Sequence, residues 1–244
     1  MRLLLLAGTP ESVEIGHALS RDGRVSVTAS MARASRAPLA MNVPMRIGGW
    51  GGVDRFHDWM TTENVGAVLD VTHPFAVSIS SRTAAVCADL GVPYVQFLRP
   101  AWTPGRDDNW VFLNSEEEAA GHVPDAARVL LMTGRRRLEA FRALGKRPIF
   151  VRVRDRGSDP FPFEEGAFIH RPVQLPVTNE IAGLRSLGVN WIVARNSGGT
   201  GSMPVIEAAQ RLGLPVGMVR RPPQPEVPRI RTISEALAWV RRRL

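Results

Sequence analysis

The sequence has one cysteine and lacks a long apolar run. Cys87 has no second cysteine to pair with, which excludes an intramolecular disulfide framework and fits a reducing compartment. No stretch of the 244 residues approaches the roughly 18 consecutive apolar residues of a membrane span. The short apolar run at the start turns directly into Gly8 and Pro10, unlike a signal peptide. We therefore expect a cytoplasmic protein without membrane contact.

Several catalytic signatures are also missing. The acidic residues Glu11, Asp70 and Glu180 do not show metal-ligand spacing with the five histidines, and there is no cysteine cluster. We therefore expect no metal site. The serine motif GxSxG is absent, and the first glycine-bearing turn is not the dinucleotide motif GxGxxG.

The charge of the chain is unbalanced, with 31 basic and 23 acidic side chains and a formal net charge of +8. Nearly all the cations are arginine, whose guanidinium pairs in two-pronged fashion with carboxylates and phosphates. This composition suits a polyanionic small molecule, although GC-rich coding accounts for it equally well. The basic residues are scattered and do not form a stripe interleaved with aromatic residues, which argues against a nucleic-acid partner.

Short apolar runs bounded by turn residues alternate with helical patterns along the whole chain. Continuous apolar runs are typical of strands buried on both faces, so the pattern predicts parallel sheets covered by helices. In the first half the runs are 3–7, 25–29, 67–71 and 94–98, with a helix at 76–90; in the second half they are 129–132, 149–153, 191–194 and 216–219.

The stretch 99–109 is polar and rich in turn residues, and it predicts a domain boundary. We expect an α/β protein of two domains, 1–102 and 103–244, with mostly parallel sheets and a cleft between the domains. Capping boxes at Ser115 with Glu118 and at Thr232 with Glu235 predict two helix starts. The pattern allows the last helix to pack on either half.

Two turns of the first half have the residues of a dinucleotide site. The turn Gly8-Thr9-Pro10-Glu11 joins a strand to a helix, where N–H groups and the helix dipole receive phosphate; a plain connecting turn explains it equally well. The second strand ends at Ser30, with Arg33 nearby. Folds that bind NADH usually have an acidic residue at this place, which bonds the ribose 2′-hydroxyl, whereas an arginine suits the 2′-phosphate of NADPH. The pattern therefore favours NADPH. Residues 48–52, GGWGG, are either a ligand-approaching loop or a flexible one.

The stretch DVTHPFA at 70–76 places polar residues directly after a buried strand, at the edge where ligands bind in such sheets. His73 could hydrogen-bond a carboxylate or donate a proton at neutral pH, and a structural role has equal weight. Thr72 could cap the following helix or contact the cofactor amide. Thr72, His73 and Pro74 are therefore candidate cofactor residues.

In the second half, two glycine-bearing turns follow strands and contain an arginine. One is Thr133-Gly134-Arg135, and the other runs from Arg195 through Ser197 and Gly198. Adjacent N–H groups in such turns form concavities for phosphate or carboxylate, to which an arginine adds charge. The pattern predicts two anion sites, although either turn could be a simple helix cap.

These motifs in this order, from GTPES, GGWGG and DVTHPFA to FLRPAW, TGR, NSGGTGS and VRRP, resemble the precorrin-6A reductase family over the whole chain. The resemblance implies two Rossmann-like domains, NADPH as hydride donor, and reduction of one macrocycle double bond to give precorrin-6B in cobalamin biosynthesis. For such a substrate we expect Arg99, Arg135 and Arg195 to hold the carboxylates of the tetrapyrrole, and His73 or solvent to supply the proton. The resemblance also allows transient contact with neighbouring pathway enzymes.

The sequence departs from the family in one respect. Family members often have lysine where Arg195 stands and another lysine near the helix that starts around Met203. Arginine stays protonated, so it can bind or polarise a substrate but hardly act as an acid. Two alternatives stay open: reduction of the cobalt-containing precorrin of the anaerobic pathway, and a non-catalytic NADPH-binding protein.

Overall fold

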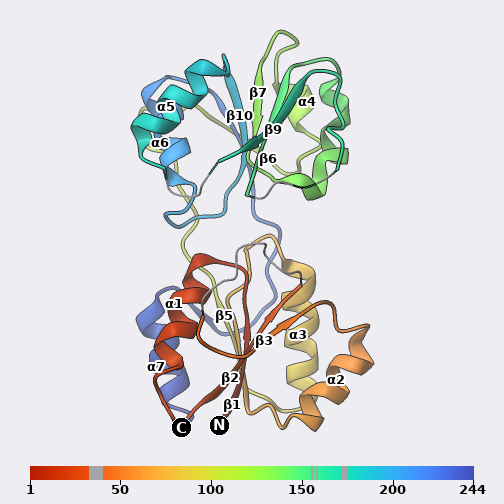
Figure 1. Ribbon diagram of the computed structural model, residues 1–244, viewed down its shortest axis with the longest axis vertical. Coiled ribbons are helices and arrows are strands. Elements are labelled where there is room, and N and C mark those ends of the chain that lie inside the picture. Colours follow the sequence, from red (N-terminus) through yellow and green to blue (C-terminus); the bar gives the residue numbers. More distant parts are fainter. Residues whose placement is uncertain (33–40, 155–156, 158, 172–174) are drawn as a thin grey trace. The chain divides into compact units, whose positions relative to one another are not determined.

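A computed structural model describes residues 1–32, 41–154, 157, 159–171 and 175–244. The chain forms two compact units (Figure 1). Unit 1 comprises Met1–Pro100 together with Pro222–Leu244, and unit 2 comprises Ala101–Arg221. Each unit is built on one parallel sheet, so the predicted α/β class is confirmed.

The sheet of unit 1 has the strand order β12-β5-β4-β1-β2-β3 within the described residues, and neighbouring strands run parallel. Its strands are β1 (Arg2–Leu6), β2 (Ser26–Met31), β3 (Met45–Ile47), β4 (Ala67–Asp70), β5 (Tyr94–Phe97) and β12 (Arg229–Ile230). β1 and β4 are the central pair, and all four residues of β4 are buried. The strand order reverses at this pair, which makes it the switch point of the sheet.

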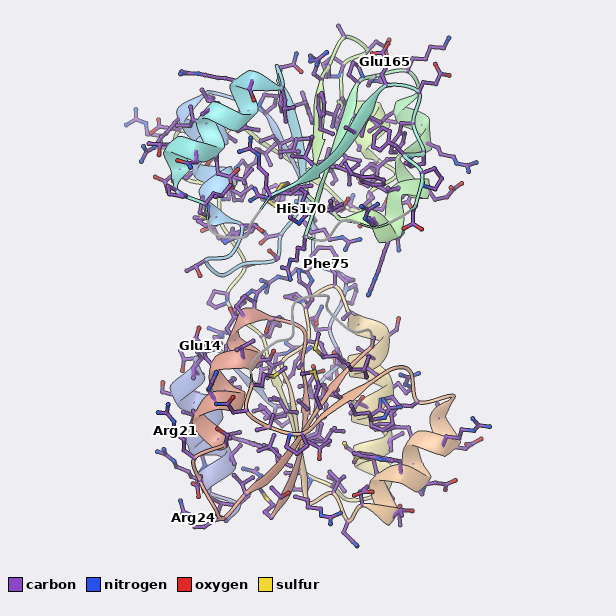
Figure 2. All side chains as sticks on the ribbon, viewed as in Figure 1. Glu14, Arg21, Arg24, Phe75, Glu165 and His170 are labelled. Carbon is purple, nitrogen blue, oxygen red and sulfur yellow. The ribbon has the colours of Figure 1, made fainter. Side chains whose placement is uncertain are left out.

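Helices cover both faces of this sheet, as Figure 1 shows. They are α1 (Pro10–Leu19), α2 (Val53–Thr62), α3 (Val77–Asp89) and α7 (Ile233–Arg241). α1 and α7 pack together on one face, over a core that includes Leu3, Leu5, Ile15 and Trp239. α2 and α3 cover the other face. Figure 2 shows charged side chains on the outer side of α1 and after it, with Glu14, Arg21 and Arg24 pointing away from the sheet.

Unit 2 repeats this plan with the strand order β6-β11-β10-β7-β8-β9 in its described part. Its strands are β6 (Trp110–Leu113), β7 (Val129–Leu131), β8 (Ile149–Val153), β9 (Gly166–His170), β10 (Trp191–Arg195) and β11 (Val216–Val219). The helices are α4 (Ala119–His122), η1 (Arg135–Leu144), α5 (Val177–Ser186) and α6 (Met203–Arg211). β7 and β10 form the pair at which the order reverses.

The sheet of unit 1 takes one edge strand from outside its consecutive run β1–β5, whereas the strands of unit 2 are consecutive in the chain. β12 comes from the last part of the chain and pairs with β5, where Ile230 is the register partner of Phe97. β6 precedes the other strands of unit 2 and pairs with β11. The expected second domain, 103–244, therefore needs correction, because 222–244 belongs with the first unit. The physical reason is that this segment supplies a strand to the first sheet and packs α7 against α1.

The eight apolar runs all form strands at or within a residue or two of the expected bounds. The capping box of the last helix is confirmed, since the Thr232 side chain accepts from the Glu235 N–H and Glu235 bonds back to the Thr232 backbone. The box expected at Ser115 and Glu118 is wrong. Glu118 instead accepts hydrogen bonds from Asn114, and only the short α4 follows. No helix in the described residues is long and apolar enough to cross a membrane.

Candidate functional site

The turns that follow β1 and β4 lie side by side at the switch point of unit 1. The two strands are hydrogen-bonded neighbours, and a Cβ atom on Gly8 would lie 3.8 Å from the backbone nitrogen of His73. The hydroxyl of Thr9 donates to the carbonyl of Val71 at 2.9 Å. The structure thus brings together two of the turns that the sequence marks as ligand-binding.

The first turn has a geometry that suits an incoming anion. The N–H of Gly8 donates to the hydroxyl of Ser12 at 3.3 Å, which is long for such a bond, and that hydroxyl donates to the carbonyl of Thr9 at 2.6 Å. A phosphate oxygen is a stronger acceptor than a hydroxyl and can replace Ser12 as the partner of Gly8. Pro10 starts α1, whose positive dipole end faces this turn.

Glu11 and Arg99 form an ion pair above the start of α1. Nη1 of Arg99 lies 2.7 Å from Oε2 of Glu11, and the two side chains are only 12% and 18% exposed. Arg99 follows β5, so the pair joins the fifth strand to the first helix. The two residues were predicted for different ligands, and the structure places them in direct contact. Arg99 offsets the negative charge that Glu11 would otherwise present to a phosphate.

The turn after β4 holds the ring of His73 in a defined way. The backbone N–H of Phe75 donates to Nδ1 of His73 at 3.2 Å. Nδ1 is therefore unprotonated, and the neutral ring has its proton on Nε2. Phe75, labelled in Figure 2, belongs to the same turn, and its ring centroid is 5.7 Å from that of His73. In this state His73 is a hydrogen-bond donor through Nε2.

Sequence reasoning missed two residues that support this turn. Oδ1 of the buried Asp70 accepts from the N–H of Thr72 at 2.9 Å. Gln224, from the returning C-terminal segment of unit 1, donates through Nε2 to the carbonyl of Pro74 at 2.9 Å. A polar residue ending the apolar run of β4 was a signal for Asp70. Gln224 had none, because its contact depends on the position of β12.

The end of β2 is described only in part. Ser30 is buried on β2, and its carbonyl accepts a hydrogen bond from the N–H of Ala7. Arg33, the expected reader of a 2′-phosphate, lies outside the described residues. The neighbouring strand β3 contributes Arg46, which stacks on the ring of Trp50 with 3.5 Å between the guanidinium carbon and the ring centroid. Arg46 also donates to the carbonyls of Gly48 and Gly49, so the GGWGG loop is fixed by internal contacts.

Unit 2 has an equivalent pair of turns. Thr133-Gly134-Arg135 follows β7, and Asn196 and Ser197 follow its neighbour β10. Thr133, Asn196 and Ser197 are each more than nine-tenths buried. The hydroxyl of Thr133 has no hydrogen-bond partner among the described residues. This edge therefore offers a buried donor next to the glycine turn.

Trp102 and Arg221, near the two ends of unit 2 in the sequence, hold the loop that contains Asn196. The amide of Asn196 exchanges two hydrogen bonds with the backbone of Trp102, at 2.8 and 2.9 Å. The indole N–H of Trp102 donates to the carbonyl of Gly199. Arg221 donates to the carbonyls of Asn196 and Ser197. Gly198 and Gly199 both have positive φ, at 65° and 71°, which this tight loop requires. The sequence pointed to Gly198 but not to these anchors.

Arg195 lies beside a buried carboxylate. Its Nε and Nη2 atoms lie 2.8 and 2.7 Å from Oε1 of Glu116, a side chain that is 7% exposed. Arg137 approaches Oε2 of the same carboxylate at 3.3 Å. Glu116 was not singled out from the sequence, because it is one of three consecutive glutamates at 116–118. The predicted substrate role of Arg195 has therefore to coexist with this internal ion pair.

Arg135 stands between two hollows of unit 2. Its guanidinium carbon lies 3.7 Å from the ring centroid of Phe168, a cation–π contact. The smaller hollow, of about 310 Å³, is also lined by Arg136 and Arg142, together with the acidic residues Glu139 and Asp159. The larger, of about 650 Å³, is also lined by Arg171. This concentration of guanidinium groups suits a ligand with several carboxylates.

Metal-ligating residues do not cluster in this fold. No group of three or more histidine, cysteine, aspartate or glutamate side chains that could hold a metal ion occurs in the described part of the chain.

Comparison with known proteins agrees with this architecture. Residues 2–241 match the family model described as "Precorrin-6x reductase CbiJ/CobK". The chain is 35% identical to the precorrin-6A reductase of Rhodobacter capsulatus, over 98% of this chain and 95% of the relative. It is also 35% identical to the precorrin-6A reductase of Mycobacterium tuberculosis, over 98% and 97%. The cobalt-precorrin-6A reductase of Methanothermobacter thermautotrophicus is 27% identical, over 91% and 77%.

A solved structure described as "CobK precorrin-6A reductase" superposes with a TM-score of 0.93 at 34% identity, and covers 100% of this chain and 97% of that one. The chain belongs to the precorrin-6x reductase family.

Proposed function

We propose that this protein is an NADPH-dependent precorrin-6A reductase, which reduces one double bond of the macrocycle to give precorrin-6B in cobalamin biosynthesis. The observation that carries the proposal is the family match over residues 2–241. The geometry of unit 1 supports it, because Gly8 and the His73 turn meet where a dinucleotide binds in such sheets.

The residues present fit a nicotinamide dinucleotide. Gly8 and the start of α1 would hold its phosphates, with Thr9 fixing the turn through Val71 and Glu11 countered by Arg99. Ser30 and Arg33 would meet the adenosine ribose and its 2′-phosphate, and Thr72, His73 and Pro74 would meet the nicotinamide end.

When bound, the cofactor supplies a hydride, and the substrate takes up one proton in addition, so a two-electron reduction of one double bond is balanced. The task of the chain is to hold the acceptor carbon in line, to exclude water and to place the proton source. His73 presents an Nε2–H in the geometry described here. This N–H can donate a hydrogen bond to the substrate or to a solvent molecule, and the proton itself comes from that solvent or from the ring in its protonated form.

The second unit supplies most of the contacts for the carboxylates of the substrate, and Arg99 of the first unit adds one. Arg135 lies at two arginine-lined hollows, and Ser197 and Gly198 belong to the anchored loop after β10. Arg195 and Arg99 are each paired with an internal glutamate, so we assign them to binding through the remaining guanidinium edges.

The test is anaerobic oxidation of NADPH by the purified protein and precorrin-6A, followed by absorbance, with NADH and the cobalt-containing macrocycle in parallel. We expect oxidation that needs the tetrapyrrole and prefers NADPH. A His73→Ala enzyme with unchanged turnover would remove His73 as proton source. Cofactor binding without turnover on either macrocycle would refute the proposal and leave a dinucleotide-binding protein.

The cobalt-containing substrate is the second candidate. Three curated relatives named cobalt-precorrin-6A reductase match at 27–28% identity, against 33–35% for those named precorrin-6A reductase. This difference favours the metal-free macrocycle, and the parallel assay decides between the two.

A further inference from the structure

Asp70 is a buried carboxylate directly beneath the His73 turn. It ends β4 and is 0% exposed. No lysine, arginine or histidine forms an ion pair with it among the residues that the structure describes. A buried charge without a cation is costly, and it persists only where hydrogen bonds or function compensate. The position of Asp70 at the switch point points to function.

Both oxygens of Asp70 have a defined partner. Oδ1 accepts from the N–H of Thr72 at 2.9 Å, and Oδ2 accepts from the hydroxyl of Tyr94 at 2.6 Å. Burial, together with the charge of Asp70, raises the pKa of Tyr94, so the tyrosine keeps the proton that it donates. The hydroxyl of Thr72 in turn lies 3.2 Å from that of Ser80 on α3. The network links β4, β5 and α3 to one backbone N–H of the turn.

We propose that Asp70 is a positioning residue for hydride transfer: through the N–H of Thr72 it fixes the turn that carries His73, and Tyr94 fixes Asp70. The proposal rests on the proposed function, since it assigns the turn to the nicotinamide end. Asp70 is 0% exposed, so we assign it no direct contact with substrate or cofactor. Its effect is on geometry, because a displacement of about 1 Å at a reacting centre can cost on the order of a hundredfold in rate.

This placement predicts which kinetic constant responds. The phosphates of NADPH are assigned to the Gly8 turn, which Asp70 does not contact, so the affinity for the cofactor depends little on Asp70. The nicotinamide end depends on the His73 turn. Loss of the Asp70 bonds should therefore lower kcat and leave KM for NADPH nearly unchanged.

The experiment compares Asp70→Ala, Asp70→Asn and Tyr94→Phe with the wild-type enzyme, using precorrin-6A and NADPH. We expect Asp70→Ala to lower kcat about 10–100-fold, with KM for NADPH changed by less than about threefold. Asp70→Asn keeps an acceptor for the N–H of Thr72 and should recover most of this loss. With NADPH deuterated at the transferred position, the isotope effect on kcat should rise in Asp70→Ala, because hydride transfer becomes slower.

The matched control is Val86→Ala, a truncation in the same buried cluster as Tyr94 that removes no polar contact. It should lower the melting temperature and leave kcat unchanged. If Asp70→Ala does not fold, Tyr94→Phe decides, with an expected fall in kcat of about 3–10-fold at constant KM. A folded Asp70→Ala, or failing that a folded Tyr94→Phe, with wild-type kcat overturns the positioning role. A wild-type enzyme that does not oxidise NADPH with either macrocycle overturns the proposed function instead.

Discussion

The ion pair between Arg195 and Glu116 gives the sharpest prediction for unit 2. Arg195→Met removes a hydrogen bond of 2.8 Å and an ion-pair contact of 2.7 Å from Oε1 of Glu116, a side chain that is 7% exposed. Removing one partner of a buried ion pair typically costs about 3–5 kcal/mol. Arg137 remains 3.3 Å from the other oxygen of Glu116, so we expect the lower end of this range, about 3 kcal/mol. For a chain of this length that is a fall in Tm of about 6–12 °C.

The second variant in this test is Arg195→Met with Glu116→Gln. Glutamine has no charge to leave uncompensated, so the double variant should recover at least about 1 kcal/mol relative to Arg195→Met alone. Denaturant unfolding at neutral pH measures both differences. A double variant no more stable than the single one would refute the reasoning that the buried charge causes the loss.

The same two proteins test the substrate role of Arg195. A lost charge-assisted hydrogen bond to a substrate carboxylate is worth about 1.5–3 kcal/mol, or roughly ten- to a hundredfold in KM for precorrin-6A. This increase should appear in both variants, whatever their stability. An unchanged KM in a folded double variant would show that Arg195 serves Glu116 only.

Three further predictions concern stability and reactivity. Burial raises the pKa of Cys87 to about 12. This thiol should therefore stay protonated at about pH 8 and react with a disulfide reagent only after the protein unfolds. Fast reaction of the native protein would contradict this. The hydrogen bond from the backbone N–H of Arg231 lowers the pKa of Glu235 in the folded protein. The capping box should therefore stabilise α7 above about pH 4 and lose this effect as the pH falls through the pKa of Glu235 in the folded state. A Glu235→Gln variant should show a weaker acid dependence of Tm. Gly166 has a φ of 121°, and an added Cβ would lie 1.7 Å from the carbonyl oxygen of Ile149. Gly166→Ala should therefore destabilise unit 2 by more than about 2 kcal/mol in urea unfolding. An unchanged unfolding midpoint would show that β9 can shift to make room for the methyl group.

The buried strands could be predicted because their residues are apolar on both faces. Runs such as Ala67–Val71 and Val216–Val219 are recognisable without knowledge of their partners. Edge strands differ. β12 consists of Arg229 and Ile230, and β3 is only Met45–Ile47, too short for any periodicity. The same limit explains the domain correction, since the pairing of β12 with β5 joins residues far apart in the sequence.

The candidate site was predictable where residues directly follow a strand. Gly8 and His73 were both identified in this way, and the structure places their turns within about 4 Å. The partners of the charged groups were not predictable. Arg99 pairs with Glu11 across 88 positions, and Arg195 pairs with Glu116 across 79. An arginine in the sequence shows a cation but not the internal carboxylate that already holds it.

The position of β12 near the end of the chain also sets the order in which the two sheets are completed during synthesis. The sheet of unit 2 has β6 before all its other strands, so it is complete once β11 has been made. The sheet of unit 1 has β5 as its outer strand until Arg229 and Ile230 are made. At ordinary translation rates this is on the order of ten seconds after β5 itself has been made. An open strand edge is a template for pairing with other chains, so this interval is the period of greatest exposure to aggregation. The half of the chain that is synthesised first is the half that is finished last.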